Sequence, residues 1–150
     1  NVNLRGERRN LNGFFTSVRG SFGVRRYRHD EREGEDEIAS QFTNNQLEFD
    51  ILGNHRPVGK LKGSVGAWAL GRSFKVEGEE ALSPPVDQRT FAGFFYEEYT
   101  VDPHVSLQFG GRVERSSFTP DSDDPARDFT NFSGSVGLLV HPSESTTVAV

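Results

Sequence analysis

The sequence predicts an all-β fold, an antiparallel up-and-down meander that forms a segment of a transmembrane β-barrel. Long segments alternate apolar and polar residues with a period of two, as strands do when their two faces meet different surroundings. The connections between these segments alternate between short and long along the chain. The 150 residues are 33% hydrophobic with a mean hydropathy of −0.61, which is lean for a compact core but suits a barrel with a wet interior.

The composition also excludes several classes of protein. The chain has no Cys, which removes disulfides, thiolate catalysis and Cys-ligated metal. It has no Met even at position 1, so we expect a processed product or an internal piece, and the missing signal peptide says nothing about destination. The net charge of −5 argues against nucleic acid as a partner. The longest charge-free run, residues 129–143, falls short of the roughly 20 apolar residues of a membrane-spanning helix.

The first elements are a partial strand at 2–8 and a long strand within 14–28. In the second of these, Val18 and Phe22 alternate with Arg19 and Ser21 over at least eleven residues. At about 3.3 Å per residue and a tilt near 45°, such a strand climbs roughly 25 Å, the height of an outer-membrane apolar band.

The next two strands continue the alternation. Leu47 and Phe49 oppose Glu48 within 41–52, and 60–76 repeats the pattern although Trp68 interrupts its polar side. Further strands are predicted at 89–101, 105–118, 129–140 and from 146 onward. The prediction is therefore a partial first strand, six full strands and a partial last one.

The connections determine the topology. The short turns are 9–13, 54–59, 101–104 and 141–145, and the long polar loops are 29–40, 77–88 and 119–128. A membrane meander places all its turns at one end and all its loops at the other, whereas a Greek-key sandwich has no reason to do so. Because the chain begins and ends inside strands, we expect an open sheet rather than a closed eight-strand cylinder.

The parity of the charges predicts which face meets lipid. From Val105 to Val113 the odd residues carry no charge, so the odd residues of this strand are assigned to lipid and the even residues to the lumen. A three-residue turn at 102–104 would pair Val101 with Val105 and Tyr99 with Leu107. On the inner side it would pair Glu98 with Gln108 and Phe94 with Arg112. A two-residue turn would reverse the parity of the preceding strand. The residues predicted to face hydrocarbon are Val18, Phe22, Leu47, Phe49, Val65, Leu107 and Phe109. Those predicted to face the interior are Arg19, Glu48, Lys62 and Arg112.

The segment FAGFFYEEYTVDPHVSLQFGGRVER, residues 91–115, resembles the barrel of TonB-dependent receptors. In that family an aromatic, acidic, aromatic strand end, like 95–99, turns through a short Asp-containing loop. The strand that follows has the pattern apolar, x, apolar, Gly, Gly or Leu, Arg, like 107–112. The resemblance covers essentially the whole chain and is most specific over 89–150.

The resemblance implies one domain, 1–150, that is about eight of the roughly 22 strands of such a barrel, with the plug domain absent. It further implies an outer-membrane protein of a Gram-negative bacterium that imports a scarce nutrient, a metal-containing complex such as a siderophore, haem or zinc. Loops and plug would capture the ligand, and the TonB complex would act through the missing plug. Two alternatives stay open: a self-contained small outer-membrane barrel with a structural or adhesion role, and a soluble β-rich binding module.

Three arginines follow the apolar stripe of the second strand. Arg25, Arg26 and Arg28 lie just before the first long loop, at the level of lipid headgroups. Guanidinium groups bind phosphate in a bidentate manner, so these residues are predicted to contact outer-membrane lipid and lipopolysaccharide. The alternative is a solvated strand end.

The first long loop is predicted to contact a metal-containing ligand through hard oxygen ligands and one imidazole. The alternative is a hydrated loop. The candidate ligand-binding residues are His29, Asp30, Glu31, Glu35, Asp36 and Glu37, together with Arg112 in the lumen. The run at 121–128 has four aspartates but lacks the Gly and closing Glu of a calcium loop.

No catalytic residue, resident metal site or cofactor is predicted. The serines lack a His and a carboxylate in a recognisable motif, and the chain has no phosphate loop or dinucleotide fingerprint. His55, His104 and His141 fall in turns of different hairpins, so we expect them to lie far apart and to share no metal. The sequence therefore predicts that the protein is not an enzyme.

Overall fold

The structure is a computed structural model that describes residues 1–32, 38–78, 84–143 and 145–150. Strands account for nearly all of these residues, and among them no helix is long and apolar enough to cross a membrane. The strands are β1 (Val2–Arg9), β2 (Phe15–Arg32), β3 (Ile38–His55), β4 (Leu61–Gly78), β5 (Val86–Asp102), β6 (Val105–Pro120), β7 (Arg127–Ser143) and β8 (Thr146–Ala149).

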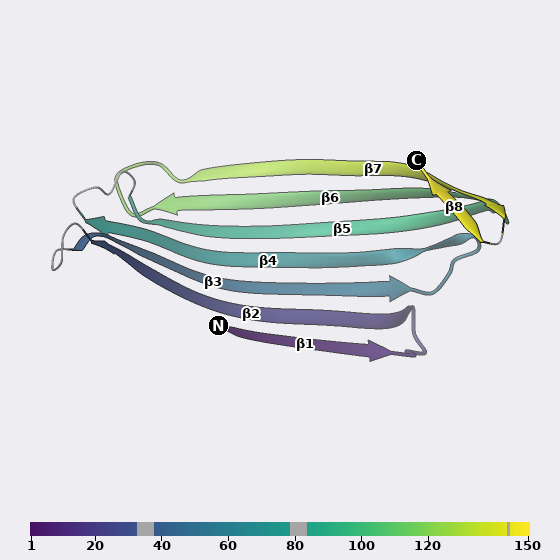
Figure 1. The fold of residues 1–150 in the computed structure, drawn as a ribbon, viewed down its shortest axis with the longest axis horizontal. Helices are drawn as coiled ribbons and strands as arrows, with labels where there is room; N and C mark the ends of the chain where they lie inside the picture. Colours follow the sequence, from purple (N-terminus) through teal and green to yellow (C-terminus); the bar gives the residue numbers. More distant parts are fainter. Residues whose placement is uncertain (33–37, 79–83, 144) are drawn as a thin grey trace.

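The strands form one antiparallel sheet in which each strand pairs with its neighbours in sequence, in the order β1 to β8. Figure 1 shows that the short turns after β1, β3, β5 and β7 lie at one end of this sheet, whereas β2, β4 and β6 end at the other. β1 and β8 are the two edges, and their described residues do not pair with each other. The all-β meander, its up-and-down topology and the open sheet are confirmed.

The strands are longer than the sequence predicted. Residues 29–32 belong to β2, and β3 already begins at Ile38, so much of the predicted loop 29–40 is paired strand. The predicted loops 77–88 and 119–128 are shortened in the same way. The predicted strands stopped at charged residues because strand ends are commonly polar. In the structure, strand pairing continues beyond the apolar stretch into a region that water can solvate.

The register assigns every side chain to one of two faces, because cross-strand partners share a face. Phe22 pairs with Phe49, Phe49 with Ala69, and Ala69 with Phe91, so these residues define the apolar face. Arg19, Glu48, Lys62 and Arg112 alternate with the apolar set and lie on the polar face. The two sets of residues that the sequence assigned to opposite faces do lie on opposite faces.

The apolar face is exposed rather than packed. Phe132 is 79% exposed and Val136 is 78% exposed, and Leu47, Phe49, Phe91 and Phe95 are also exposed. On β4 this face carries only apolar residues and glycines over 11 residues (61–71), and on β6 over nine (105–113). Strands that cross a bilayer need about 9 to 11 residues, so the apolar face has the width of a membrane-facing band.

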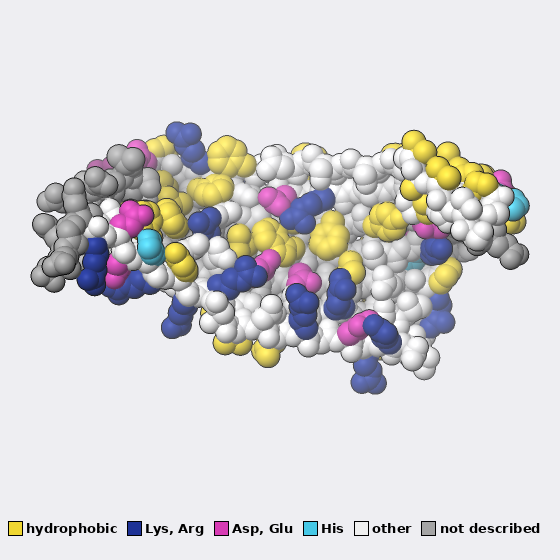
Figure 2. Space-filling model, in the orientation of Figure 1, with side chains coloured by type: hydrophobic (Ala, Val, Ile, Leu, Met, Phe, Trp, Pro, Cys, Tyr) yellow, Lys and Arg dark blue, Asp and Glu magenta, His cyan; other side chains and the backbone are white. Residues whose placement is uncertain are grey.

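The polar face is crowded, and Figure 2 shows its charged side chains over the middle of the sheet with hydrophobic ones among them. Thr90 is 1% exposed, and Ser106 and Ser116 are also buried although no second layer covers them. The Thr90 and Ser116 hydroxyls are 3.0 Å apart. Such crowding is expected on the concave side of a curved wall, where neighbouring side chains converge.

The turn between β5 and β6 combines the two predicted alternatives. Asp102 pairs with Val105, which closes a two-residue turn, while Tyr99 pairs with Leu107 as a three-residue turn required. A bulge at Val101 absorbs the extra residue, so the predicted pair of Val101 with Val105 is wrong. The bulge restores the parity, and the apolar residues of β5 remain on the apolar face.

Candidate functional site

The centre of the polar face is occupied by Arg112 of β6 between two aromatic rings. Its guanidinium carbon lies 5.3 Å from the centroid of the Trp68 ring and 5.9 Å from that of Phe94. Both distances are within the range of a cation–π interaction. The guanidinium also donates a hydrogen bond to Glu114, so the cation is held on three sides.

The register explains how three strands bring these groups together. Phe94 is the direct partner of Arg112, and Ala92 pairs both with Trp68 and with Glu114. Ala92 is buried because the two long side chains on either side of it cover its methyl group. A larger residue at this position would separate Trp68 from the Arg112 cluster.

The polar contacts continue from this cluster towards β2. The Trp68 indole Nε1 donates a hydrogen bond of 2.8 Å to Glu48 Oε1, and Arg25 Nη2 lies 3.8 Å from Glu48 Oε2. We call the set Arg25, Glu48, Trp68, Phe94, Arg112 and Glu114 the polar wall. Among the described residues no buried side-chain nitrogen or oxygen lacks a hydrogen-bond partner.

A second cluster on the polar face lies nearer the short-turn end. Lys62 Nζ lies 3.1 Å from Glu98 Oε1, and Gln108 Nε2 donates to Glu98 Oε2 over 3.3 Å. Glu98 pairs with Gln108 across the β5–β6 ladder, as predicted. These side chains extend the charged surface along the sheet.

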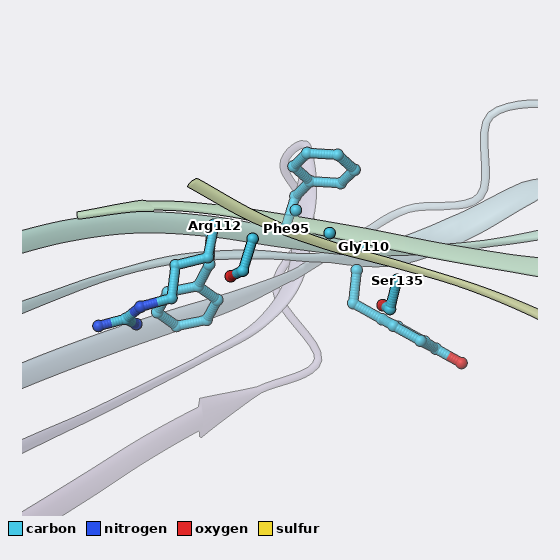
Figure 3. Close-up of a pocket in the computed structure, with 9 residues that line it drawn as sticks. Phe95, Gly110, Arg112 and Ser135 are labelled. Carbon is cyan, nitrogen blue, oxygen red and sulfur yellow. The ribbon is translucent and has the colours of Figure 1, made fainter. Parts of the chain in front are cut away.

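A shallow hollow of about 390 Å³ lies beside Arg112. Phe94, Gly110, Ser133 and Ser135 contribute to its lining. Gly110 forms its floor, since a Cβ there would lie 3.2 Å from the Ser135 hydroxyl. Figure 3 shows the Arg112 and Phe95 side chains on opposite sides of the sheet.

The predicted ligand residues of the first loop do not converge. His29 and Glu31 lie on the polar face of β2, with His29 Nε2 3.8 Å from Glu31 Oε1, whereas Asp30 lies on the opposite face beside Arg28. The His29 ring also lies 6.2 Å from that of Phe42. Glu35, Asp36 and Glu37 lie outside the described residues. Within the residues that are described, no three His, Asp or Glu side chains are grouped as a metal site.

The three predicted lipid-contact arginines also divide between the faces. Arg25 belongs to the polar wall through Glu48, while Arg26 and Arg28 lie on the apolar face. The Arg28 guanidinium lies 3.4 Å from Asp30. Consecutive residues of a strand point to opposite faces, so a run of basic residues in the sequence is not one cluster in space.

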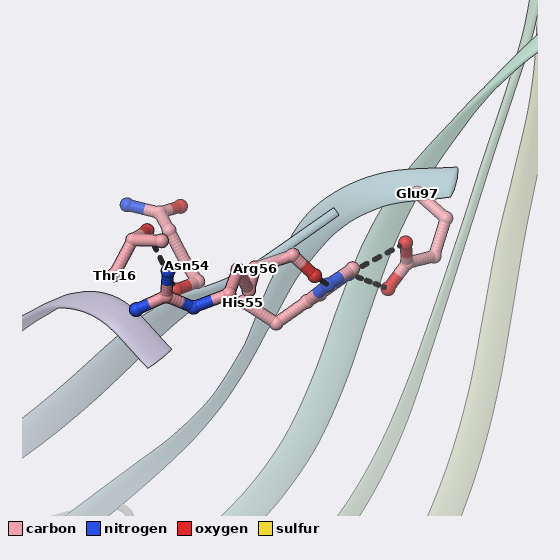
Figure 4. A network of polar contacts seen from close by, with 5 residues as sticks. All are labelled: Thr16, Asn54, His55, Arg56 and Glu97. Carbon is pink, nitrogen blue, oxygen red and sulfur yellow. Dashed lines mark hydrogen bonds and ion pairs between the residues drawn. The ribbon is translucent and has the colours of Figure 1, made fainter. Parts of the chain in front are cut away.

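A buried histidine–carboxylate pair lies on the apolar face near the short-turn end, and the sequence did not predict it. His55 Nε2 lies 2.9 Å from Glu97 Oε2, and both side chains are buried (Figure 4). His55 Nδ1 lies 2.7 Å from the Arg56 carbonyl oxygen. The Phe14 ring stacks on the imidazole at 5.7 Å. Gly63 of the intervening strand β4 leaves the space through which the Glu97 carboxylate reaches His55.

The other two turn histidines lie close together. The His141 backbone N–H donates a 2.7 Å hydrogen bond to the His104 carbonyl, and His104 Nδ1 lies 3.0 Å from the His141 carbonyl oxygen. The expectation that they are far apart is wrong, because β6 and β7 are neighbours and their short-turn ends coincide.

Polar-wall members other than Arg25 and Arg112 were not singled out as site residues from the sequence. Phe94 was correctly paired with Arg112, but Trp68 was treated as an interruption of the alternation. The signal that could have found this cluster is that Trp68, Phe94 and Arg112 all fall at even positions, which the registers of β4, β5 and β6 place on the same face.

Comparisons with known proteins agree with this architecture. A solved structure described as "Copper transporter OprC" is similar in fold, with a TM-score of 0.66 at 14% sequence identity. The match covers 95% of this chain and 27% of that chain, and at this identity it shows the fold alone. No curated protein sequence matches significantly.

The family model described as "TonB dependent receptor-like, beta-barrel" matches residues 1–149. This match spans the whole sheet, including the polar wall, the apolar band and both kinds of connection. The chain therefore belongs to the TonB-dependent receptor β-barrel family, whose members are outer-membrane proteins of Gram-negative bacteria.

Proposed function

We propose that this chain is part of the wall of an outer-membrane receptor that imports a scarce nutrient, a metal-containing complex, through its barrel. The observation that carries the proposal is that one face of the sheet is an exposed apolar band and the other carries the hydrogen-bonded polar wall. The first suits contact with lipid, and the second suits a wet lumen. A plug domain outside this chain would fill the lumen and connect the receptor to the TonB complex.

In this proposal the polar wall guides the ligand rather than transforming it. Arg112 presents a cation whose position is fixed by Trp68 and Phe94, so an anionic group of a passing ligand or of the plug can pair with it. Nearer the loop end, His29 and Glu31 of the predicted ligand set are on the same face as this wall. Asp30 lies on the apolar face beside Arg28 and so does not contribute to this ligand path.

The proposed cargo is a metal complex such as a siderophore, haem or zinc. Copper is a further cargo to test, because the solved structure of similar fold is described as a copper transporter. The test is accumulation of ferric citrate, haemin, zinc and copper by host cells that lack the gene and by cells in which it is restored. If the restored gene raises accumulation of none of these under metal limitation, import of a metal complex is refuted.

The role of the wall is tested by Arg112→Ala in the restored gene. Loss of the cation is expected to lower uptake by up to about tenfold, the equivalent of one cation–π or charge-assisted contact. Arg115→Ala is the matched control, because Arg115 is on the same strand but on the apolar face, 3.1 Å from Asp128. Equal uptake by the two variants would show that Arg112 does not contact the ligand during import.

A further inference from the structure

The apolar face ends abruptly at the long-loop end of the sheet. Along β3 Leu47 on this face is followed by Asn45 and Thr43, and along β4 Gly71 is followed by Ser73. A membrane protein changes from apolar to polar side chains at the level where lipid chains give way to headgroups. A site at this boundary can therefore contact both parts of one lipid.

A hollow of about 370 Å³ lies at this boundary. Gly71 forms part of its floor, and a Cβ at this position would meet no heavy atom within 4 Å. Val24 and Leu47 line it on the side of the apolar band, and Asn45 and Ser73 line it on the side of the loops. The hollow therefore has an apolar half towards the membrane and a polar half towards the outside.

Two arginines flank this hollow from opposite sides, Arg26 on β2 and Arg89 on β5. Both are exposed, and neither has a carboxylate partner within the part of the chain that the structure describes. Neighbouring cations on the same face are paired, as Lys75 is with Glu77. Asp87 also lines the hollow, so the three side chains carry a net charge of +1 (two arginines and one aspartate).

We propose that this hollow binds the phosphorylated headgroup of lipopolysaccharide. Three strand spacings separate β2 from β5, about 14 Å between backbones. The two guanidinium groups can thus grip two phosphates of one disaccharide headgroup by bidentate hydrogen bonds. The acyl chains descend over Val24 and Leu47. Asp87 reaches a phosphate through a bridging divalent cation.

This site replaces the arginine cluster that the sequence predicted. Arg25 is committed to the polar wall and Arg28 to Asp30, so only Arg26 of that cluster is available. Arg89 is distant in sequence and is added by the register of β4 with β5, where it is the partner of Gly71. The inference rests on the outer-membrane orientation of the proposed function, but not on import or its cargo.

The test is binding of purified lipopolysaccharide to the intact protein in detergent with Mg²⁺ present. Arg26→Gln and Arg89→Gln are each expected to weaken binding about tenfold, the loss of one charge-assisted contact, and the double variant more. Gly71→Leu fills the hollow and is expected to weaken binding similarly. Arg28→Gln is the matched control and is expected to bind as the unaltered protein does.

Two further ligands separate lipid from free anion. Dephosphorylated lipopolysaccharide is expected to bind the unaltered protein only as well as intact lipopolysaccharide binds the double variant, and inorganic phosphate is expected not to compete. Folding of each variant is checked by its migration in detergent gels with and without heating. Undiminished binding by the double variant, equal loss with Arg28→Gln, or efficient competition by inorganic phosphate would each overturn the proposal. Nutrient accumulation by the variants is expected to be unchanged, which keeps this test separate from that of import.

Discussion

At the scale of single residues, the main problem is how Glu97 can lie on the apolar face. An unpaired carboxylate in an apolar setting is costly, and the cost falls when the charge is paired and hydrogen-bonded. His55 supplies the partner, and the Phe14 ring covers it from outside. Gly63 has no side chain to keep the two apart. The charge is therefore enclosed on the lipid side by the protein itself.

This arrangement predicts strongly unequal effects of single and double substitutions. His55→Leu leaves the Glu97 carboxylate buried and unpaired and is expected to lower the free energy of unfolding by roughly 3 kcal/mol. His55→Leu combined with Glu97→Leu removes both polar groups and is expected to cost much less, since an apolar pair can replace a buried ionic one. Urea unfolding in lipid vesicles measures both. Additive losses would show that the two side chains are not coupled.

A second prediction concerns the side chains of β7. Val136 on the apolar face is near the middle of the band, so Val136→Arg is expected to cost about 2 to 4 kcal/mol in lipid vesicles. Ser135→Arg places the same side chain on the polar face one residue away and is expected to cost much less. The measurement is the same urea titration. Similar losses for both variants would contradict the assignment of the faces.

At the scale of elements, the bulge at Val101 decides the register of β5. Thr100 pairs with Ser106 and Asp102 with Val105, so Val101 has no partner across the ladder. The Asp102 carboxylate accepts a 2.7 Å hydrogen bond from the His104 N–H, which fixes the tight turn beside the bulge. One unpaired residue thus reconciles a two-residue turn with the parity of the strands.

Deletions test this directly. Removal of Val101 is expected to preserve every remaining pair and to yield a folded barrel, because the residue takes no part in the ladder. Removal of Phe94 is expected to prevent folding, since it reverses the faces of all residues on one side of the deletion. Migration in detergent gels before and after heating distinguishes folded from unfolded protein. A folded Phe94 deletion or an unfolded Val101 deletion would refute the assigned register.

The same elements show what the sequence could and could not predict. Alternation and turn spacing predicted all eight strands, because period and connection length are local properties. The ends of β2 and β3 were missed because pairing beyond the apolar band depends on the partner strand, not on hydrophobicity. The sequence did not predict the whole polar wall, because the proximity of Trp68 to Arg112 depends on two registers, that of β4 with β5 and that of β5 with β6. Likewise, Arg26 and Arg89 are distant in sequence, and only the pairing of β2 to β5 places them at the same hollow.

At the scale of the whole molecule, the boundary of the apolar face steps along the sheet. It lies above Leu47 on β3 and Gly71 on β4, which are direct partners, but above Phe91 on β5, two residues nearer the short-turn end. A boundary that is level in the membrane must step in this way when strands tilt, as barrel strands do by about 35 to 45°. The two-residue step is the one expected of a level band on tilted strands.

The orientation of the molecule gives a prediction that uses the absence of Cys. Ser122→Cys lies in the connection after β6 and is expected to react with a membrane-impermeant maleimide in intact cells. Val58→Cys lies in the short turn after β3 and is expected to react only after the outer membrane is permeabilised. The unaltered protein has no thiol and serves as the control. The opposite order of labelling would show that the molecule has the reverse orientation in the membrane.

The extension of β2 and β3 beyond the apolar band has a consequence for how the protein changes in evolution. Paired residues such as Arg28 with Thr43 and His29 with Phe42 continue the two-faced arrangement where no lipid imposes it. In the proposed orientation the outward members of these pairs are accessible from outside the cell, while the inward members continue the polar face. We therefore expect natural variants of this protein to differ at every second position of these exposed ribbons, in a pattern that a loop of the same length would not show.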